Sequence, residues 1–279
     1  MSAAPASTET GWRAHLRLGF AHDGARTHIS ERAHEGPLYV QRPFYPEGDV
    51  CHAYILHPPA GMVGGDRLET NVRVASGASA LITTPASAKV YRSVGPAAEI
   101  HQHLTVDARG TLEWLPQDTI LFGGSSATIK TDIRLAESAR FMGWELLSLG
   151  RPLSGDRYRT GDLRQGTSIQ VDGAPRLIER QDWEAGDALL QAVWGLGGRA
   201  VVGAFYIHPA GTALLERARG CVAVPGYEHF AATLLEDLLV IRALGDDATA
   251  MREAMAVLWS QLRQPALDRP ACAPRIWAT

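Results

Sequence analysis

His57 and Asp66 have the residue types of a general base and of the carboxylate that orients it. In a hydrolase, the imidazole would accept a proton from a nucleophile while the aspartate held the ring in place. No nucleophile stands near them in the sequence, and an aspartate after Gly64 and Gly65 is typical of a tight turn whose carboxylate accepts backbone N–H groups. We therefore favour the turn and keep a β-rich hydrolase that uses His57 and Asp66 as an alternative.

His101 and His103 could bind a metal ion, because residues at i and i+2 share one face of a strand. The neighbouring sequence supplies no third ligand, so an ordinary solvent-facing strand is favoured. The two histidines are kept as secondary candidates, and no discrete metal site is predicted.

Two carboxylates stand in apolar surroundings, where burial without a partner is costly. Glu145 lies in the run from Phe141 to Leu147, and Glu179 follows a Leu-Ile pair. Each could form a buried ion pair, with Arg140 or Arg180 as the partner, or could line a wet internal cavity or passage. The sequence leaves both interpretations open.

A polar and basic pair of strands is predicted shortly after the Gly64-Gly65 turn. Its side chains would suit an anion or an acidic partner surface, and they are Thr83, Thr84, Lys89, Tyr91 and Arg92. An ordinary exposed strand pair is slightly favoured, and a small-anion binding module is kept as a second alternative. The nucleotide-binding GxxxxGK[ST] motif, the HExxH and GxSxG motifs, and paired CxxC are absent, so none of these enzyme templates fits, although their absence does not decide against catalysis.

Composition points to a globular protein of a reducing compartment. The chain has 279 residues with a net charge of −3, which gives no broad basic surface for nucleic acid. Cys51, Cys221 and Cys272 are too dispersed for a disulfide framework. Residues 1–10 lack the pattern of a secretory signal, and the apolar stretch from Ala188 to Ile207 is interrupted by glycines and an arginine. We expect a cytoplasmic protein that does not enter a membrane.

The fold is expected to be dominated by β-strands, whose spacing fits a sandwich, a barrel or a β-solenoid equally. Residues 13–20 alternate between apolar and polar, and short runs of the same kind follow between turns rich in Gly and Pro. Further strands are expected at 38–42, 51–57, 70–75, 79–84, 90–94, 100–106, 111–115, 120–122, 127–135 and 168–171. The segment 139–149 fits either a buried strand or a short helix.

The C-terminal part has a different pattern. Tyr227, Leu234 and Ile241 fall at helical spacing before a stop at Gly245, and a second helix fits Ala248–Arg263. We expect residues 1–11 to form a disordered tail and residues 12–279 to form one domain. Within it, residues 12–225 form the β body, residues 227–263 a helical pair packed on that body, and residues 264–279 a docked tail.

Several long motifs, taken together, closely resemble the UreD family of urease accessory proteins, called UreH in some organisms. The matching stretches are 36–48, 57–68, 83–93, 112–117, 143–145, 149–152 with Gly155, and 274–277. They follow the family order over nearly the whole chain. Ala60, Asp118 and Asp156 depart from the usual pattern, and Ala60 stands where a glycine is common.

The resemblance implies an irregular β-helical, solenoid-like body of many short strands with a small helical part. It also implies a non-enzymatic assembly factor, with no tightly bound cofactor, for the transient handling of Ni²⁺. Family members bind apo-urease and recruit UreF, which holds the GTPase UreG, and accessory complexes of this kind are expected to pair as dimers. The absent phosphate-binding motif agrees with that division of labour.

On this resemblance, Asp66, Glu145 and Glu179 would line a hydrated route for Ni²⁺, which weak oxygen contacts would bind only transiently. Further interface or motif residues are Arg42, Phe44, Tyr45, Thr83, Thr84, Lys89, Tyr91, Arg92, Arg151, Arg275 and Trp277. The helical pair and the tail with Arg275 and Trp277 are the expected UreF side, because aromatic residues are enriched at protein interfaces.

Overall fold

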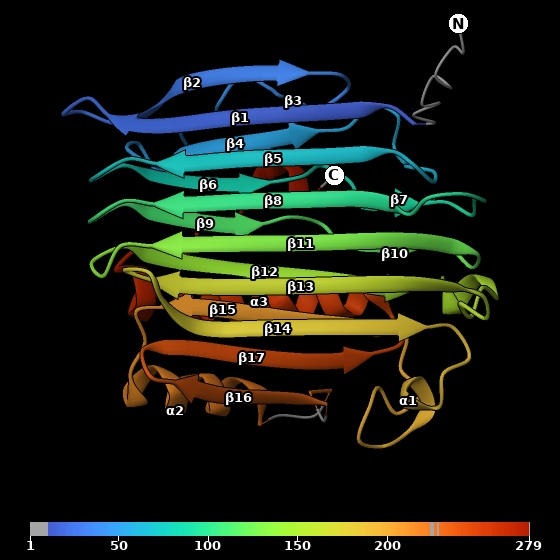
Figure 1. Cartoon of the computed structure of the whole chain (residues 1–279). Coiled ribbons are helices and arrows are strands. Elements are labelled where there is room, and N and C mark those ends of the chain that lie inside the picture. Colours follow the sequence, from blue (N-terminus) through green and yellow to red (C-terminus); the bar gives the residue numbers. More distant parts are fainter. Residues whose placement is uncertain (1–10, 224–225, 228, 279) are drawn as a thin grey trace, which may run out of the picture.

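In the computed structural model, the strands stack in two facing sheets (Figure 1). The structure describes residues 11–223, 226–227 and 229–278. The seven-stranded sheet has the order β14-β13-β11-β8-β5-β1-β2. Its strands are β1 (Arg13–His22), β2 (Thr27–Glu35), β5 (Arg67–Val74), β8 (Ala98–Val106), β11 (Ser125–Leu135), β13 (Gly161–Val171) and β14 (Ala174–Glu184).

The ten-stranded sheet has the order β16-β17-β15-β12-β9-β6-β4-β3, and two short strands lie beside the end of β12. Its strands are β3 (Tyr39–Val40), β4 (Cys51–Leu56), β6 (Ser79–Thr83), β7 (Ala88–Val90), β9 (Thr111–Leu115), β10 (Thr119–Leu121), β12 (Arg140–Leu149), β15 (Val201–His208), β16 (Phe230–Leu235) and β17 (Leu238–Gly245). The segment 139–149 therefore forms a strand.

The chain winds between the two sheets as a solenoid does. Successive strands cross from one sheet to the other, and equivalent strands of successive turns pair in parallel, as β5, β8, β11 and β13 do. Antiparallel pairs close both ends of the seven-stranded sheet. The expected strand-dominated, solenoid-like fold is confirmed.

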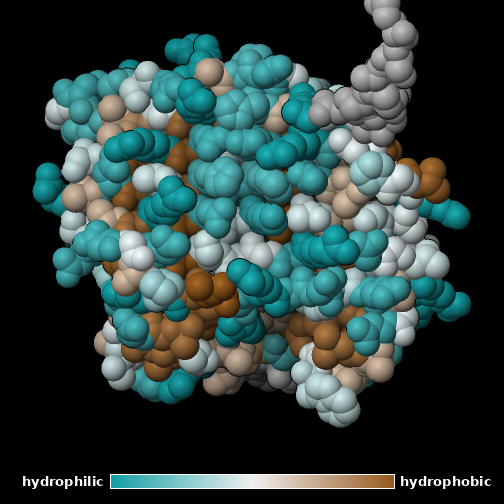
Figure 2. All heavy atoms as spheres, viewed as in Figure 1, coloured by the Kyte–Doolittle hydropathy of each residue, from teal (hydrophilic) through white to brown (hydrophobic). Residues whose placement is uncertain are grey.

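Side chains stack in rows across the parallel strands because register is kept from turn to turn. One inward row is aliphatic and almost fully buried, and it consists of Leu18, Val72, Leu104, Ile133 and Ile169. The outward rows are polar, and Figure 2 shows hydrophilic side chains gathered over β1, β5, β8 and β11. The alternation that predicts strands thus also decides which face is buried.

The expected first helix of the C-terminal pair is wrong. Residues 230–245 form the antiparallel hairpin of β16 and β17. Leu238, Leu239, Val240 and Ile241 are all fully buried, because β17 packs toward the other sheet on one face and toward helices on the other. An apolar run buried on both faces loses the alternation that marks a strand, and its Leu and Ile spacing then imitates a helix.

Helices cover the outer face of the ten-stranded sheet. The second expected helix is confirmed as α3 (Ala248–Leu267), capped by Asp247 and packed on β12 and β15. The sequence reading missed α1 (Ala188–Gln191) and α2 (Thr212–Val222), which packs on β16, β17 and α3. None of the helices in the described part of the chain has the length and apolar character needed to cross a bilayer.

A buried charged network joins α3 to the β body. The Arg263 side chain is fully buried, and its guanidinium donates to Glu113 at 2.8 Å and to Glu47 at 2.6 and 2.8 Å. The indole of Trp259 also donates to Glu113, at 2.7 Å, and His52 lies 2.6 Å from Glu47. One guanidinium therefore compensates two carboxylates that come from different turns of the solenoid.

The C-terminal segment lies against the same helix. The Trp277 ring centroid is 5.5 Å from that of Trp144 and 5.4 Å from that of Trp259. Its indole N–H donates to the Thr83 hydroxyl at 3.0 Å. These contacts tie the end of the chain to β6, β12 and α3.

We expect Trp277→Ala to lower the free energy of unfolding by about 3 kcal/mol, the lower end of the usual loss for a packed tryptophan, because the side chain is partly exposed. Urea unfolding followed by circular dichroism would measure the change. Trp194→Ala is the control, since Trp194 is 84% exposed and its loss should cost little. Equal effects of the two substitutions would show that the tail contributes no packing.

Glycines allow the loop before β5 to pack closely on the loop before β8. A Cβ at Gly61 would lie 2.1 Å from the Tyr91 ring, and one at Gly64 would lie 2.5 Å from the Pro96 carbonyl oxygen. Both distances are far shorter than van der Waals contact permits. The glycine-rich motif is therefore explained by close packing between neighbouring turns.

Ala60 has a φ of 58°, in the left-handed region, where a Cβ is strained. We expect Ala60→Gly to stabilise the fold by about 0.5–1 kcal/mol once the greater unfolded-state entropy of glycine is subtracted. Thermal unfolding would test this, with Ala86→Gly as a control that should destabilise. A lower melting temperature for Ala60→Gly would contradict the strain.

Candidate functional site

A polar row crosses the inside of the seven-stranded sheet, next to the aliphatic rows. Strand register aligns Thr70, Gln102, Thr131, Thr167 and Glu179 on β5, β8, β11, β13 and β14. Thr131 is 1% and Thr167 3% exposed, so the row lies deep between the sheets. Polar groups in such a position need partners, and several of them converge on one carboxylate.

That carboxylate is Glu145, which points from β12 across the interior toward the polar row. The Thr131 hydroxyl donates to one oxygen at 2.5 Å, and the Thr167 hydroxyl and Gln165 amide donate to the other at 2.6 and 3.3 Å. Burial raises the pKa of Glu145 and the charge of Glu179 raises it further, although the two threonines oppose the shift. Among the described residues no cationic side chain pairs with Glu145, so the predicted pair with Arg140 is wrong.

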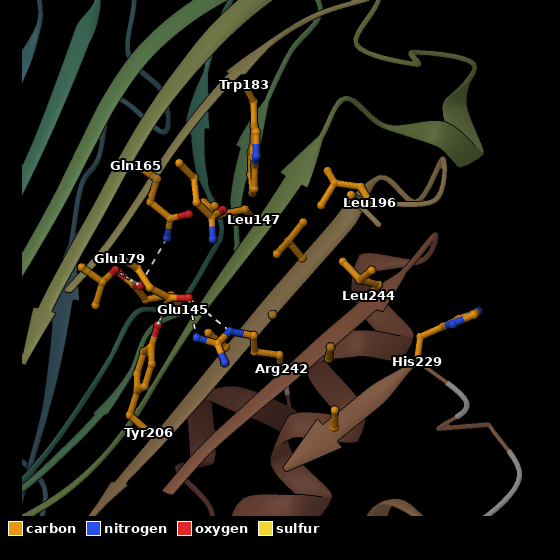
Figure 3. Close-up of a pocket in the computed structure, with 18 residues that line it drawn as sticks. Glu145, Leu147, Gln165, Glu179, Trp183, Leu196, Tyr206, His229, Arg242 and Leu244 are labelled. Atoms are coloured by element: carbon orange, nitrogen blue, oxygen red, sulfur yellow. Dashed lines mark hydrogen bonds and ion pairs between the residues drawn. The ribbon is translucent and has the colours of Figure 1, made fainter. Parts of the chain in front are cut away.

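Glu145 borders a cavity of about 310 Å³ that we name the Glu179 cavity (Figure 3). Glu179 accepts from the Arg242 guanidinium at 2.5 and 3.1 Å and from the Tyr206 hydroxyl at 3.4 Å. Its ion-pair partner is therefore Arg242 on β17, which corrects the expected partner Arg180. Burial and the nearby Glu145 and Glu179 charges raise the pKa of Tyr206, which keeps this hydroxyl protonated.

A second cavity of about 160 Å³, the His57 cavity, lies on the other side of Glu145. Three buried polar atoms among its lining residues have no hydrogen-bond partner in the described structure, namely His57 Nε2, Trp114 Nε1 and Gln117 Oε1. Burial lowers the pKa of His57 against the pull of Asp66, which favours the neutral imidazole. Buried polar atoms without protein partners are normally satisfied by water, and the cavity far exceeds the about 15 Å³ that one water molecule needs.

The cavities adjoin one another, because they share lining residues. The Glu179 and His57 cavities share Glu145, Leu147 and Gln165 as lining residues. A groove of about 730 Å³ around Gly166 shares Gln165, Thr167, Glu179 and Gln181 with the Glu179 cavity. Carboxylates and amides thus follow one another from the β13–β14 end of the stack to the first parallel turns.

The oxygen atoms along this series could contact a hard or borderline divalent cation but could not trap it. No group of three or more His, Cys, Asp or Glu side chains in the described ranges could hold a metal ion. Both oxygens of Glu145 already accept hydrogen bonds, and Glu179 is paired with Arg242. A cation here would therefore compete for one or two ligands at a time, which favours exchange over tight binding.

The structure does not bring Asp66 into these cavities, which corrects its expected place on a route with Glu145 and Glu179. One Asp66 oxygen accepts from Trp12 N at 3.1 Å and the other from Val63 N at 2.8 Å. Asp66 is 1% exposed and holds the turn before β5 against β1. With both oxygens bound to the backbone, its carboxylate is a turn cap and not the orienting partner of His57 that a hydrolase would need.

His101 and His103 lie on the outward face of β8. His101 is 3.5 Å from Glu99, and His103 is 3.4 Å from Asp132. Burial is the main cause that lowers the pKa of His101. The two histidines thus belong to the polar outer surface and lie apart from the internal cavities.

The predicted basic strand pair is divided by the fold. Thr83 is fully buried and donates to the Leu115 carbonyl, while Thr84 lines the His57 cavity. Tyr91 and Arg92 are exposed in the loop that follows β7. Lys89, on β7, is half-buried.

The other expected interface residues occupy two separate places. Phe44 stacks on Tyr54 and Arg26 lies over the Tyr45 ring, both near the start of β4, whereas Arg151 lies over Phe122 at the opposite end of the turns. Arg42 and Arg275 are exposed.

Sequence reasoning missed the partners that make the carboxylates distinctive. Thr131 and Thr167 are ordinary strand residues in the sequence, and Arg242 stands far from Glu179 along the chain. One signal was available, since Thr131 and Thr167 fall at inward positions of alternating strands, where an apolar residue is expected.

Comparisons with known proteins identify the family of this chain. The model of the UreD urease accessory protein family matches residues 12–278. The urease accessory protein UreD of Alkalilimnicola ehrlichii is 45% identical over 279 residues, covering 100% of this chain and 94% of the relative. Those of Pseudomonas putida strain W619 and Citrobacter koseri are 43% and 42% identical, covering 97% and 96% of this chain and 96% and 92% of the relatives. The chain therefore belongs to the UreD family of urease accessory proteins.

Proposed function

We propose that this protein acts in urease maturation as a non-catalytic, cytoplasmic scaffold that binds apo-urease, recruits UreF and through it UreG, and passes Ni²⁺ through its interior. Family membership supports the role in maturation. The partners and the cargo are those of the resemblance described above. The interior passage is supported by the cavities of this chain.

The observation that carries the passage is Glu145. It is a carboxylate in the middle of a solenoid, without a cationic partner in the described structure, at the junction of two cavities. A buried carboxylate without a counter-ion is destabilising, so its presence favours a functional role over a structural one.

An entering divalent cation would stabilise the ionised form of Glu145 and relieve the repulsion from Glu179. The cation would keep part of its water shell, because the His57 cavity has room for several water molecules and offers unpartnered polar atoms to them. Weak, successive oxygen contacts would then let the ion move on. The side chains of the polar row, which face Glu145 across the interior, would line the other side of this route.

The test is to co-express the chain with apo-urease, UreF and UreG and to supply nickel, GTP and bicarbonate. We expect Glu145→Gln and the paired substitution Glu179→Gln with Arg242→Gln to co-purify with all partners but to leave urease with little nickel. Glu31→Gln is the matched control, because Glu31 is exposed on β2 and lines none of these three cavities. Normal nickel content in both variants would overturn the passage, and loss of the complex would show that these residues are structural.

A further inference from the structure

Four loops meet at the edge of the solenoid where strands β5, β8, β11 and β13 begin. This edge lies at the right of Figure 1. Backbone hydrogen bonds join them, from Tyr91 N to Met62 O, from Phe122 N to Val90 O and from Gly124 N to Thr160 O. The Arg92 stem lies over Gly124, where a Cβ would be 2.8 Å from Arg92 Cγ. The edge is therefore one connected surface.

This edge carries arginines that the fold does not neutralise. Arg92, Arg151, Arg157 and Arg159 are exposed, and none of them forms an ion pair in the described structure. Some exposed arginines elsewhere form pairs, such as Arg17 with Glu31 and Arg73 with Asp107, whereas others, such as Arg134 and Arg180, form none in the described structure. What distinguishes this edge is that four such arginines gather on it, in a chain whose net charge is −3.

Two acidic residues of the edge, Asp156 and Asp162, accept hydrogen bonds within the fold and keep their negative charge. The Asp156 oxygens accept from Gly123 N at 3.0 Å and from Tyr158 N at 3.1 Å. Asp162 accepts from the Ser126 hydroxyl at 3.0 Å. Neither carboxylate lies within ion-pair distance of the four arginines in the described structure.

Aromatic rings hold part of the edge in place. The Arg151 guanidinium carbon lies 4.4 Å from the Phe122 ring centroid, and Phe122 packs on Tyr91 at 4.8 Å. Two aliphatic side chains stand out beside the arginines, Val94 at 97% and Leu153 at 78% exposed. A guanidinium group that is already fixed by a ring, beside exposed aliphatic side chains, is suited to protein recognition. Little conformational entropy of that arginine is lost when a partner binds.

We propose that this edge, which we name the arginine edge (Tyr91, Arg92, Val94, Arg151, Leu153, Arg157 and Arg159), docks an acidic segment of a partner protein whose apolar side chains cover Val94 and Leu153. The edge adjoins the passage, because Ala60 lines the His57 cavity and the Tyr91 ring lies against the next residue, Gly61. A partner held here would stand next to one end of the route. This inference goes beyond the proposed function and does not depend on it.

The first test uses a fluorescein-labelled peptide of alternating glutamate and leucine, measured by fluorescence anisotropy at several salt concentrations. We expect binding that weakens with salt, and a loss of at least about tenfold for Arg92→Ala with Arg151→Ala, the factor that corresponds to about 1.4 kcal/mol. Arg17→Ala with Arg73→Ala is the control pair and should bind like the wild type. Equal binding by both pairs, or tighter binding of a single-stranded DNA of equal charge, would overturn the acidic protein segment as the ligand.

The second test places a photo-crosslinking phenylalanine analogue at Val94 in the complex co-expressed with apo-urease and UreF, with Ile178 on β14 as the control site. We expect crosslinks from position 94 to map to an acidic segment, and Arg92→Glu with Arg151→Glu to abolish them at an unchanged melting temperature. If the complex forms but its crosslinks map to a segment without acidic residues, the arginine edge is refuted and the scaffold stands. If no complex forms while the peptide still binds, the scaffold fails and the arginine edge stands.

Discussion

Replacing Arg263 with alanine is expected to lower the free energy of unfolding by about 3–5 kcal/mol, because it would leave two buried carboxylates without their cation. Glu113 is 1% exposed, and Glu47 is nearly as buried, with 9% of its side chain exposed. Burial lowers the pKa of Arg263, but the hydrogen bonds that it donates to Glu47 and Glu113 outweigh this effect, so the pKa is raised and the guanidinium stays charged. Urea unfolding at neutral pH would measure the loss.

The matched control for Arg263→Ala is Arg17→Ala, which removes an exposed pair with Glu31 and should cost no more than about 1 kcal/mol. A similarly small loss at Arg263 would show that the network contributes no charge compensation.

The same network predicts that the protein loses stability in acid. Burial raises the pKa of Glu47, yet hydrogen bonds from His52 and Arg263 lower it overall, so its stabilisation is present above the ordinary value of 4.5 and is lost as the pH falls through the depressed folded value.

Unlike Arg263→Ala, Glu145→Gln is expected to raise the stability of the fold while it lowers the nickel content of urease. Burial raises the pKa of Glu145 above its ordinary value of 4.5, so folding favours the protonated form more than the unfolded chain does. Its stabilisation is fully present below pH 4.5 and is lost as the pH rises through the raised folded value. The neutral amide of the variant keeps that stabilisation at every pH.

The variant should therefore unfold at higher urea concentration than the wild type at pH 7, and the difference should close near or below pH 4.5. Glu31→Gln, at an exposed position on β2, should show no such closing difference. A variant less stable than the wild type at neutral pH would mean that Glu145 is ionised and compensated in the fold. Together with a large loss of urease nickel, the expected gain would mark Glu145 as a residue kept for function at a cost in stability.

Local pattern determined much of the β body. The strand Thr111–Leu115 has the bounds that its sequence predicts, and the alternation of residues 13–20 recurs as inward and outward faces of β1. Gly61 and Gly64 also signal their role in the sequence, because only glycine tolerates such close approach of neighbouring backbone and rings. These features depend on the backbone and on nearest neighbours, so a sequence can specify them directly.

Tertiary structure decided those features that depend on contacts between segments distant in the chain. The run 238–241 is a strand because both of its faces are buried, although its spacing also fits a helix. Asp66 and Glu145 are both carboxylates in conspicuous motifs, yet one caps a turn and the other lies between two cavities. The sequence alone determined the family, the dominance of strands and the unusual carboxylates, and the solenoid-like fold followed only from the family resemblance. Only the register of the turns placed Thr131, Thr167 and Arg242 against them, because those contacts join segments distant in the chain.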